Sequence, residues 1–100
     1  MHMRISWGQL KPGQWDEYER TFKKQTRGEQ VKGLKARYLV RDTSKPDAGF
    51  AITVWSSERA MKAYDGDSAA KEKRLAPFRS FFTGEFTAHL TEVRVAKTYD

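Results

Sequence analysis

The run from Phe50 to Trp55 (FAITVW) contains no charged side chain, although 32% of the residues in the sequence are charged. Side chains of a β-strand point alternately to the two faces of a sheet. A run without charge at either alternation therefore predicts a strand with both faces covered. Ile5 to Leu10 (ISWGQL) is a second uncharged run and predicts another strand. Because helices can cover only one face of such a sheet, the other face must meet a subunit, a ligand or a nucleic acid.

The remaining segments predict helices and more polar strands. Trp15, Tyr18 and Phe22 share the spacing of one apolar stripe on a helix. From Val31 to Arg41 polar and apolar residues alternate, which is typical of a strand at a sheet edge. The expected elements are strands at 5–10, 31–41, 50–55 and 85–97, and helices from 12 or 13 to 28, from 56 or 57 to 64, and from 68 to 77.

This order, β-α-β-β-α-(α)-β, predicts a single α+β domain over residues 1–100. One antiparallel sheet with helices on one face is a ferredoxin-like sandwich. In that topology the first and third strands are central. These are the two uncharged runs, so the hydrophobic pattern and the expected topology agree.

Composition limits the possible functions. The absence of cysteine excludes disulfides, thiolate metal sites and a cysteine nucleophile. The sequence has no apolar run long enough for a transmembrane helix and no visible signal peptide, so we expect a cytoplasmic protein without a membrane partner. A net charge of +6 is compatible with nucleic-acid binding. However, the lysines and arginines are interspersed with Asp and Glu, which favours an ordinary solvated surface.

Single-stranded RNA is one alternative for the second sheet face. The two uncharged runs resemble the signature strands of the RNA-recognition motif, which stacks bases on aromatic side chains. That motif has a basic residue and a second aromatic ring where this chain has Ala48 and Ile52. On the first strand, Ser6 and Gln9 replace the expected aromatic residue and asparagine. An RNA-binding module is therefore the lesser alternative, and we do not expect nucleic acid to be the partner.

A different family matches the order and spacing of segments along nearly the whole chain. These segments are KPG (11–13), WDEYERTF (15–22), VKGLKARYLVRD (31–42), PDAGFAITVWSSERAMKAY (46–64) and FFTGEFTAHLTEV (81–93). Together they resemble the antibiotic biosynthesis monooxygenase-like family of dimeric α/β barrels. In that family two sheets pack face to face across a two-fold axis. The resemblance therefore implies a homodimer in which the partner copy covers the second face of residues 50–55.

The resemblance also implies a cofactor-independent monooxygenase acting on a small aromatic substrate in a pocket between sheet and helices. Such enzymes use no metal or flavin, and let a deprotonated, electron-rich substrate reduce O₂. The site needs an enclosed apolar pocket, a group that takes or holds a proton, and hydrogen bonds to the developing charge. A non-catalytic dimer that binds a small ligand is the alternative.

His89 and Tyr64 are the candidate catalytic residues. His89 is the only internal histidine, and the ordinary pKa of histidine suits a base near neutral pH. The alternative is a histidine satisfied by a neighbour at the sheet surface or the dimer interface. Tyr64, like Tyr38, can donate a hydrogen bond to a substrate oxygen or else pack in the core.

The other candidates would line the pocket or bind the substrate. Trp7 and Trp55 lie on the expected central strands and can either wall the pocket or pack at the dimer interface. Arg74 and Arg37 can anchor an anionic substrate or lie in solvent. Ser6 follows from the family resemblance alone.

Three positions test whether this chain resembles the haem-degrading branch of the family. Its first-strand asparagine, its tryptophan and its iron-binding histidine correspond by spacing to Ser6, Tyr64 and Arg74. The chain contains no asparagine, and an arginine does not ligate haem iron. We therefore expect no haem degradation and no cofactor.

Overall fold

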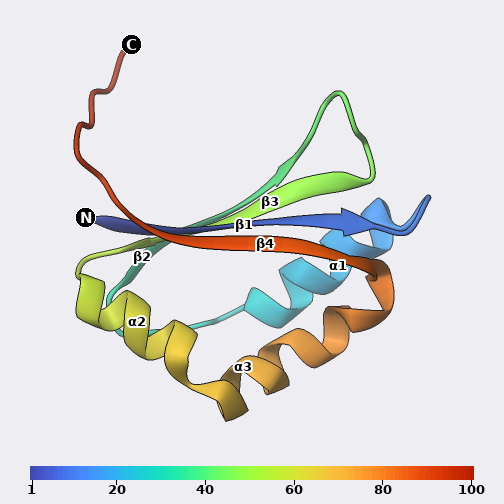
Figure 1. The fold of residues 1–100 in the computed structure, drawn as a ribbon, viewed down its shortest axis with the longest axis horizontal. Coiled ribbons are helices and arrows are strands. Elements are labelled where there is room, and N and C mark those ends of the chain that lie inside the picture. The colour runs from blue at the N-terminus through green and yellow to red at the C-terminus, as the bar shows by residue number, and fades with distance from the viewer.

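The computed structural model describes residues 1–100 and contains one four-stranded antiparallel sheet in the order β2-β3-β1-β4 (Figure 1). Its strands are β1 (His2–Leu10), β2 (Leu34–Arg41), β3 (Ala48–Trp55) and β4 (Phe82–Glu92). The two uncharged runs are the central strands β1 and β3, and the alternating segment forms the edge strand β2. The predicted ferredoxin-like α+β fold is confirmed.

All the helices lie on one side of this sheet (Figure 1). They are α1 (Trp15–Thr26), α2 (Glu58–Gly66), α3 (Ser68–Leu75) and a 3₁₀ helix, η1 (Ala76–Phe81). Ser57 caps α2 by accepting a hydrogen bond from the Ala60 amide at 3.1 Å, and Asp67 caps α3 by accepting one from the Ala70 amide at 3.1 Å. None of the helices is long and apolar enough to cross a membrane.

Several predicted strand boundaries differ from the structure. β1 begins at His2 rather than 5, and β3 begins at Ala48 rather than 50. The last strand begins at Phe82 rather than 85 and ends at Glu92 rather than 97. Glu92 pairs with His2, the first residue of β1, so residues beyond 93 have no neighbouring strand to pair with, and they extend away from the sheet (Figure 1). The second strand begins at Leu34 rather than 31, because Gly33, with φ of 84°, turns the chain just before it.

The strand register assigns each residue to one of two faces. Ser6 pairs with Ala51 and Ala88 on the face covered by the helices. The opposite, open face carries the next residues along each strand, so Ile5 lies beside Ile52 and His89. The positions of the open face are Met3, Ile5, Trp7, Gln9, Ala36, Tyr38, Val40, Ala48, Phe50, Ile52, Val54, Thr87, His89 and Thr91.

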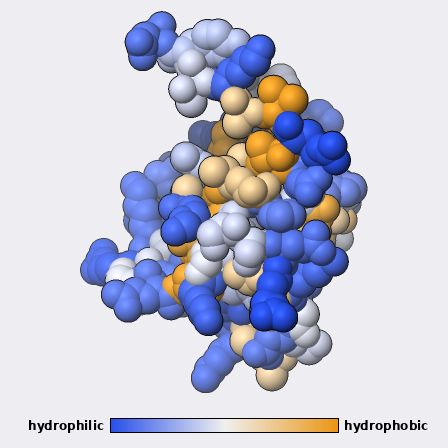
Figure 2. Space-filling view, turned by 90° about the vertical axis from the view of Figure 1, so that its left-hand side faces the viewer, coloured by the Kyte–Doolittle hydropathy of each residue, from blue (hydrophilic) through white to orange (hydrophobic).

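The paired positions of the open face thus include no Lys, Arg, Asp or Glu. Several of its apolar side chains are exposed. Tyr38 is 56% exposed, Val40 41% and Phe50 37%. Hydrophilic side chains dominate the side of the molecule seen in Figure 2. In the side view of Figure 2 the apolar residues form only a broken band through the middle. The sequence argument that one face of the sheet is left uncovered by helices therefore holds within a single chain.

The core between sheet and helices is built mainly from aromatic rings. Leu10, Trp15 and Tyr18 form its buried cluster. The ring centroid of Tyr18 lies 5.3–6.4 Å from those of Trp15, Phe22, Phe78, Phe81 and Phe82. Under α2, Trp55 and Met61 are also buried. These contacts hold α1 and η1 to each other and to the sheet.

The packing of α1 on β3 depends on Gly49. An added methyl group there would overlap the Val40 carbonyl and lie 2.9 Å from the ring of Trp15. We expect Gly49→Ala to lower the free energy of unfolding by about 1–3 kcal/mol in urea denaturation. The matched control is Gly66→Ala at the end of α2, where the new methyl meets nothing within 4 Å. Its stability should be unchanged or raised by up to about 1 kcal/mol. Equal stabilities of the two variants would contradict the close packing of Trp15 on β3.

Candidate functional site

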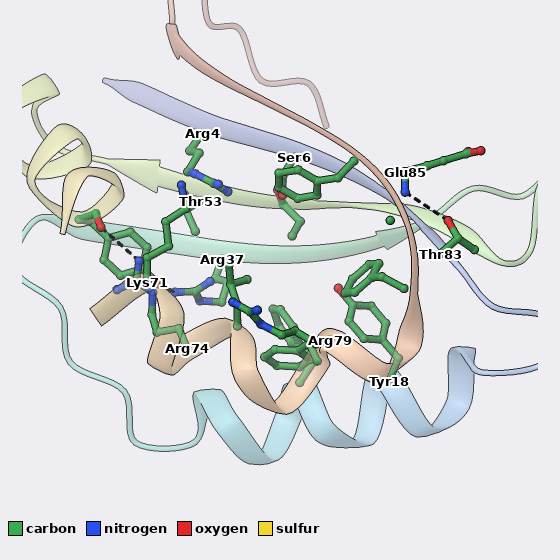
Figure 3. Close-up of a pocket in the computed structure, with 18 residues that line it drawn as sticks. Arg4, Ser6, Tyr18, Arg37, Thr53, Lys71, Arg74, Arg79, Thr83 and Glu85 are labelled. Atoms are coloured by element: carbon green, nitrogen blue, oxygen red, sulfur yellow. Dashed lines mark hydrogen bonds between the residues drawn. The ribbon is translucent and has the colours of Figure 1, made fainter. Parts of the chain in front are cut away.

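A cavity of about 490 Å³ lies between the helix-covered face of the sheet and the helices (Figure 3). Its floor consists of small side chains from the central strands, namely Ser6, Ala51 and Thr53. Its walls come from β2, α1, α2, α3, η1 and the start of β4. The cavity therefore occupies the place that the family resemblance predicted for a pocket.

One end of the cavity is aromatic. Its lining rings are those of Tyr18, Phe22, Phe78, Phe82 and Phe86. Burial raises the pKa of Tyr18 to about 12, so its hydroxyl is neutral at physiological pH. A neutral phenol can donate a hydrogen bond but cannot act as a base. This end therefore offers flat apolar walls and one hydroxyl donor.

The other end is cationic and centres on Tyr64. Arg37 donates two hydrogen bonds to the Glu29 carboxylate, at 2.9 and 3.2 Å. Its Nη2 also donates to the Tyr64 hydroxyl at 3.2 Å. The guanidinium carbon of Arg74 lies 3.6 Å from the centroid of the Tyr64 ring. Its Nη2 donates to the Tyr64 backbone carbonyl at 3.1 Å. Tyr64 is thus held between two guanidinium groups.

Asp65 organises two further cations. Its carboxylate accepts a hydrogen bond from Arg4 at 2.7 Å and one from Lys71 at 3.4 Å. Burial acts to raise the pKa of Asp65, but the hydrogen bond and charge of Arg4, together with Lys71, outweigh it and hold the pKa below its ordinary value. Asp65 therefore remains ionised and fixes both cations against the cavity.

Four of the residues predicted from the sequence line this cavity, namely Ser6, Arg37, Tyr64 and Arg74. Ser6, Tyr64 and Arg74 are the positions that correspond by spacing to the haem-degrading residues. Trp55 lies behind the wall: its ring centroid is 4.9 Å from that of Tyr64, and its indole N–H donates to Thr53 at 2.8 Å. Trp55 is fully buried, so it supports Tyr64 rather than facing the cavity or a dimer interface.

The other three predicted residues lie on the open face. His89, Trp7 and Tyr38 have the strand parity of Ile5 and Ile52, opposite to Ser6. Within one chain none of these side chains reaches a molecule in the cavity, because the sheet lies between them. For Tyr38, the core packing considered as an alternative is also not found, since the side chain is 56% exposed.

The sequence analysis missed Tyr18, Arg4, Lys71 and Arg79, all of which line the cavity. A signal existed for two of them. Arg4 has the same strand parity as Ser6, and Lys71 lies one helical turn before Arg74. Tyr18 was assigned to an apolar helix stripe, which correctly places it inward but does not distinguish a cavity wall from the core.

The ion pairs of Asp65 generate a pH-dependent prediction. Asp65→Asn leaves Arg4 without its carboxylate, and should lower the free energy of unfolding at pH 7 by about 1–3 kcal/mol. Because the pKa of Asp65 is lower in the folded protein, its stabilisation is complete above the unfolded pKa of about 4 and is lost as the pH falls toward the folded value. Urea denaturation should therefore show a smaller difference from wild type at pH 3 than at pH 7.

The control for this variant is Glu72→Gln. Glu72 pairs with Arg79 on the surface, where the two side chains are 69% and 56% exposed. Its loss should change the free energy of unfolding by less than about 1 kcal/mol. An Asp65→Asn effect that is equal at both pH values would show that the ion pairs are not its cause.

Similar structures share the fold over almost the entire chain. A candidate antibiotic biosynthesis monooxygenase from Bordetella bronchiseptica has a TM-score of 0.79 at 14% identity, over 94% of this chain and 97% of its own. A mutant of SnoaB, a cofactor-independent oxygenase from Streptomyces nogalater, has a TM-score of 0.75 at 17% identity, over 95% of this chain and 94% of its own. A MhuD mutant with two manganese protoporphyrin IX molecules bound per active site has a TM-score of 0.77 at 22% identity, over 99% of this chain and 100% of its own.

The family itself is identified by sequence. No curated protein matches the chain. The sequence model of the antibiotic biosynthesis monooxygenase family, however, matches residues 2–73, which include β1, α1, β2, β3, α2 and most of α3. This match includes the floor of the cavity, Arg37 and Tyr64. The chain therefore belongs to the antibiotic biosynthesis monooxygenase family.

Proposed function

We propose that the protein is a cytoplasmic, cofactor-independent monooxygenase that acts on a small aromatic substrate in the cavity. The observation that carries this proposal is the division of the cavity into an aromatic end and a cationic end around the Tyr64 hydroxyl. A flat aromatic ring suits the first end. An oxygen atom that becomes negative during the reaction suits the second.

The size of the cavity supports a substrate with fused rings. A volume of about 490 Å³ falls within the range of roughly 300–1,000 Å³ that is usual for small-molecule sites. Rings of Phe78 and Phe82 provide apolar faces for stacking. The small floor residues Ser6 and Ala51 leave the room that the substrate occupies.

Deprotonation of the substrate would be favoured by charge. The Tyr64 hydroxyl accepts a hydrogen bond from Arg37, so its own proton is free for donation to a substrate oxygen. Together with the guanidinium group of Arg37, that donor stabilises the negative charge on the substrate oxygen, and so lowers the pKa of the hydrogen that the substrate loses. The cavity lining includes no histidine, and Asp65 is held as an ion by Arg4 and Lys71. In this proposal the substrate proton therefore passes to water at the cavity mouth.

The resulting anion is electron-rich enough to reduce O₂. For an anthrone-type substrate, the ring CH₂ becomes a carbonyl. One atom of O₂ enters the product, and the other leaves as water with the two hydrogens of the CH₂. The protein supplies orientation and anion stabilisation, and the substrate supplies all the electrons.

Tyr64→Phe tests the proposed hydrogen-bond donor. The protein should accelerate O₂ consumption with anthrone, without added metal or flavin, and Tyr64→Phe should lower the rate by about 10-fold to 100-fold. The matched control is Tyr38→Phe, the same change on the open face, which should leave the rate within about twofold. His89→Ala in the same assay tests the base role predicted from the sequence.

The oxygen electrode also separates the two candidate functions. Binding of anthrone without O₂ consumption above the protein-free rate would contradict the oxygenase and favour a non-catalytic ligand-binding protein. Equal rates for wild type and Tyr64→Phe would contradict the assigned role of Tyr64.

The proposal includes a homodimer formed through the open face. Exposed apolar side chains such as Phe50 and Val40 lie on β3 and β2 of this face, and none of the paired residues of the face is Lys, Arg, Asp or Glu. A flat apolar sheet surface of this kind suits a second identical sheet. It does not suit RNA, because a phosphate backbone requires nearby Lys or Arg side chains. The homodimer of the family resemblance is thus supported by the composition of the face.

Sedimentation equilibrium over a wide concentration range tests this assembly. Wild type should be a dimer, and Ile52→Asp at the centre of the open face should raise the dissociation constant by at least about tenfold, because the new carboxylate would be buried without a partner. Val95→Asp is the control, since Val95 is 76% exposed and lies beyond the sheet. A wild-type monomer at all concentrations would contradict the proposed dimer.

A further inference from the structure

The cationic end of the cavity holds more positive charge than its own carboxylates neutralise. Five cationic side chains line the cavity: Arg4, Arg37, Lys71, Arg74 and Arg79. Three carboxylates pair with them. Asp65 is shared between Arg4 and Lys71, Glu29 holds Arg37, and Glu72 holds Arg79. Two positive charges therefore remain for a ligand.

The one acidic residue of the cavity lining, Glu85, does not change this balance at the cationic end. Glu85 belongs to the start of β4. In Figure 3 its carboxylate points away from the labelled cationic side chains, at the other side of the cavity. Its backbone amide donates a hydrogen bond to the Thr83 hydroxyl at 3.3 Å.

Arg74 is the cation of this group that has no carboxylate partner. Its contacts are the backbone carbonyl and the ring of Tyr64. These contacts fix the guanidinium in place and leave further N–H groups free to donate. Lys71 lies one turn earlier on the same helix and shares Asp65 at the longer distance of 3.4 Å. Figure 3 shows the two side chains next to each other at one end of the cavity.

A substrate with a single negative charge would neutralise only one of the two unpaired positive charges. The anion formed during the proposed reaction is accounted for by the Tyr64 hydroxyl and Arg37. Arg74 and Lys71 then remain available for a second negative group that is present before the reaction begins. Planar guanidinium groups bind carboxylates through paired hydrogen bonds.

We propose that the substrate is an aromatic carboxylic acid, with its rings at the aromatic end of the cavity and its carboxylate bound by Arg74 and Lys71. This inference deepens the proposed function and rests on it, since it names the substrate class of the same cavity. It also explains why the pocket is cationic rather than uniformly apolar. An uncharged polycycle would cover Arg74 without giving it an anionic partner.

Binding of a matched ligand pair tests the inference without any turnover. The probes are anthraquinone-2-carboxylate and anthraquinone-2-carboxamide, which have nearly the same shape and differ in charge. Isothermal titration calorimetry should show at least about tenfold tighter binding of the carboxylate at low salt, as expected for charge-assisted hydrogen bonds. The preference should shrink as KCl is added, because salt screens the charges.

Variants of Arg74 locate the effect. Arg74→Gln should reduce the preference to within about twofold, and Arg74→Lys should retain part of it because the charge remains. Arg94→Gln is the control: Arg94 is 84% exposed and pairs with Glu92, outside the cavity lining. Arg94→Gln should prefer the carboxylate probe over the carboxamide probe by the same factor as wild type. Urea denaturation of each variant checks that the fold is intact.

The outcomes distinguish this inference from the proposed function. Equal binding of the two probes, or a preference that persists in Arg74→Gln, would overturn the aromatic-acid inference even if the protein consumes O₂ with neutral substrates. A clear carboxylate preference that depends on Arg74 supports the inference even if no O₂ is consumed, and only the oxygenase proposal would then fail.

Discussion

The register of β1 between its two neighbours decides what every other part of the molecule can do. Ser6 is paired with Ala51 on one side and with Ala88 on the other, and all three point toward the helices. Because side chains alternate along a strand, a slip of one residue would exchange the two faces of β1. Trp7 would then fill the cavity. The cavity and the uncharged face are therefore two consequences of one hydrogen-bonding pattern.

The cavity exists because small side chains on the sheet lie opposite large aromatic side chains of the helices. At the centre of the sheet, the helix-covered face carries Ser6, Gly8, Gly49, Ala51 and Thr53. The aromatic rings of α1, η1 and β4 pack against one another around Tyr18 and hold the helices away from this floor. Protein interiors are otherwise closely packed, so space of this size above a floor of small residues is a feature that the sequence maintains at several positions at once.

The sheet order could be predicted from sequence because the signal was local: a run such as Phe50–Trp55 has no charge at either parity. Which face of each strand points toward the helices could not be predicted in this way, because no short run of residues indicates it. His89, Trp7 and Tyr38 are as suitable for a pocket as Ser6 and Tyr64 by residue type, and only their parity separates them. Arg4 could have fixed that parity, since a charged residue at an even position of β1 is not expected on an uncharged face of the sheet. Trp55 illustrates the converse, because its parity is that of the cavity floor while α2 covers it completely.

The positive charges show why composition alone could not identify the site. Along the sequence Arg4, Arg37, Lys71, Arg74 and Arg79 are widely separated and look like parts of a solvated surface. The fold brings them together because β1, β2, α3 and η1 border the same cavity. Glu29 and Asp65 hold three of these cations in position before any ligand arrives, which reduces the entropy lost on binding. Arg74 is held instead by the backbone carbonyl and the ring of Tyr64, so its position is fixed without a carboxylate partner. That combination, an ordered cation without a counterion beside an aromatic cavity, is what favours an acidic ligand over a neutral one of the same shape.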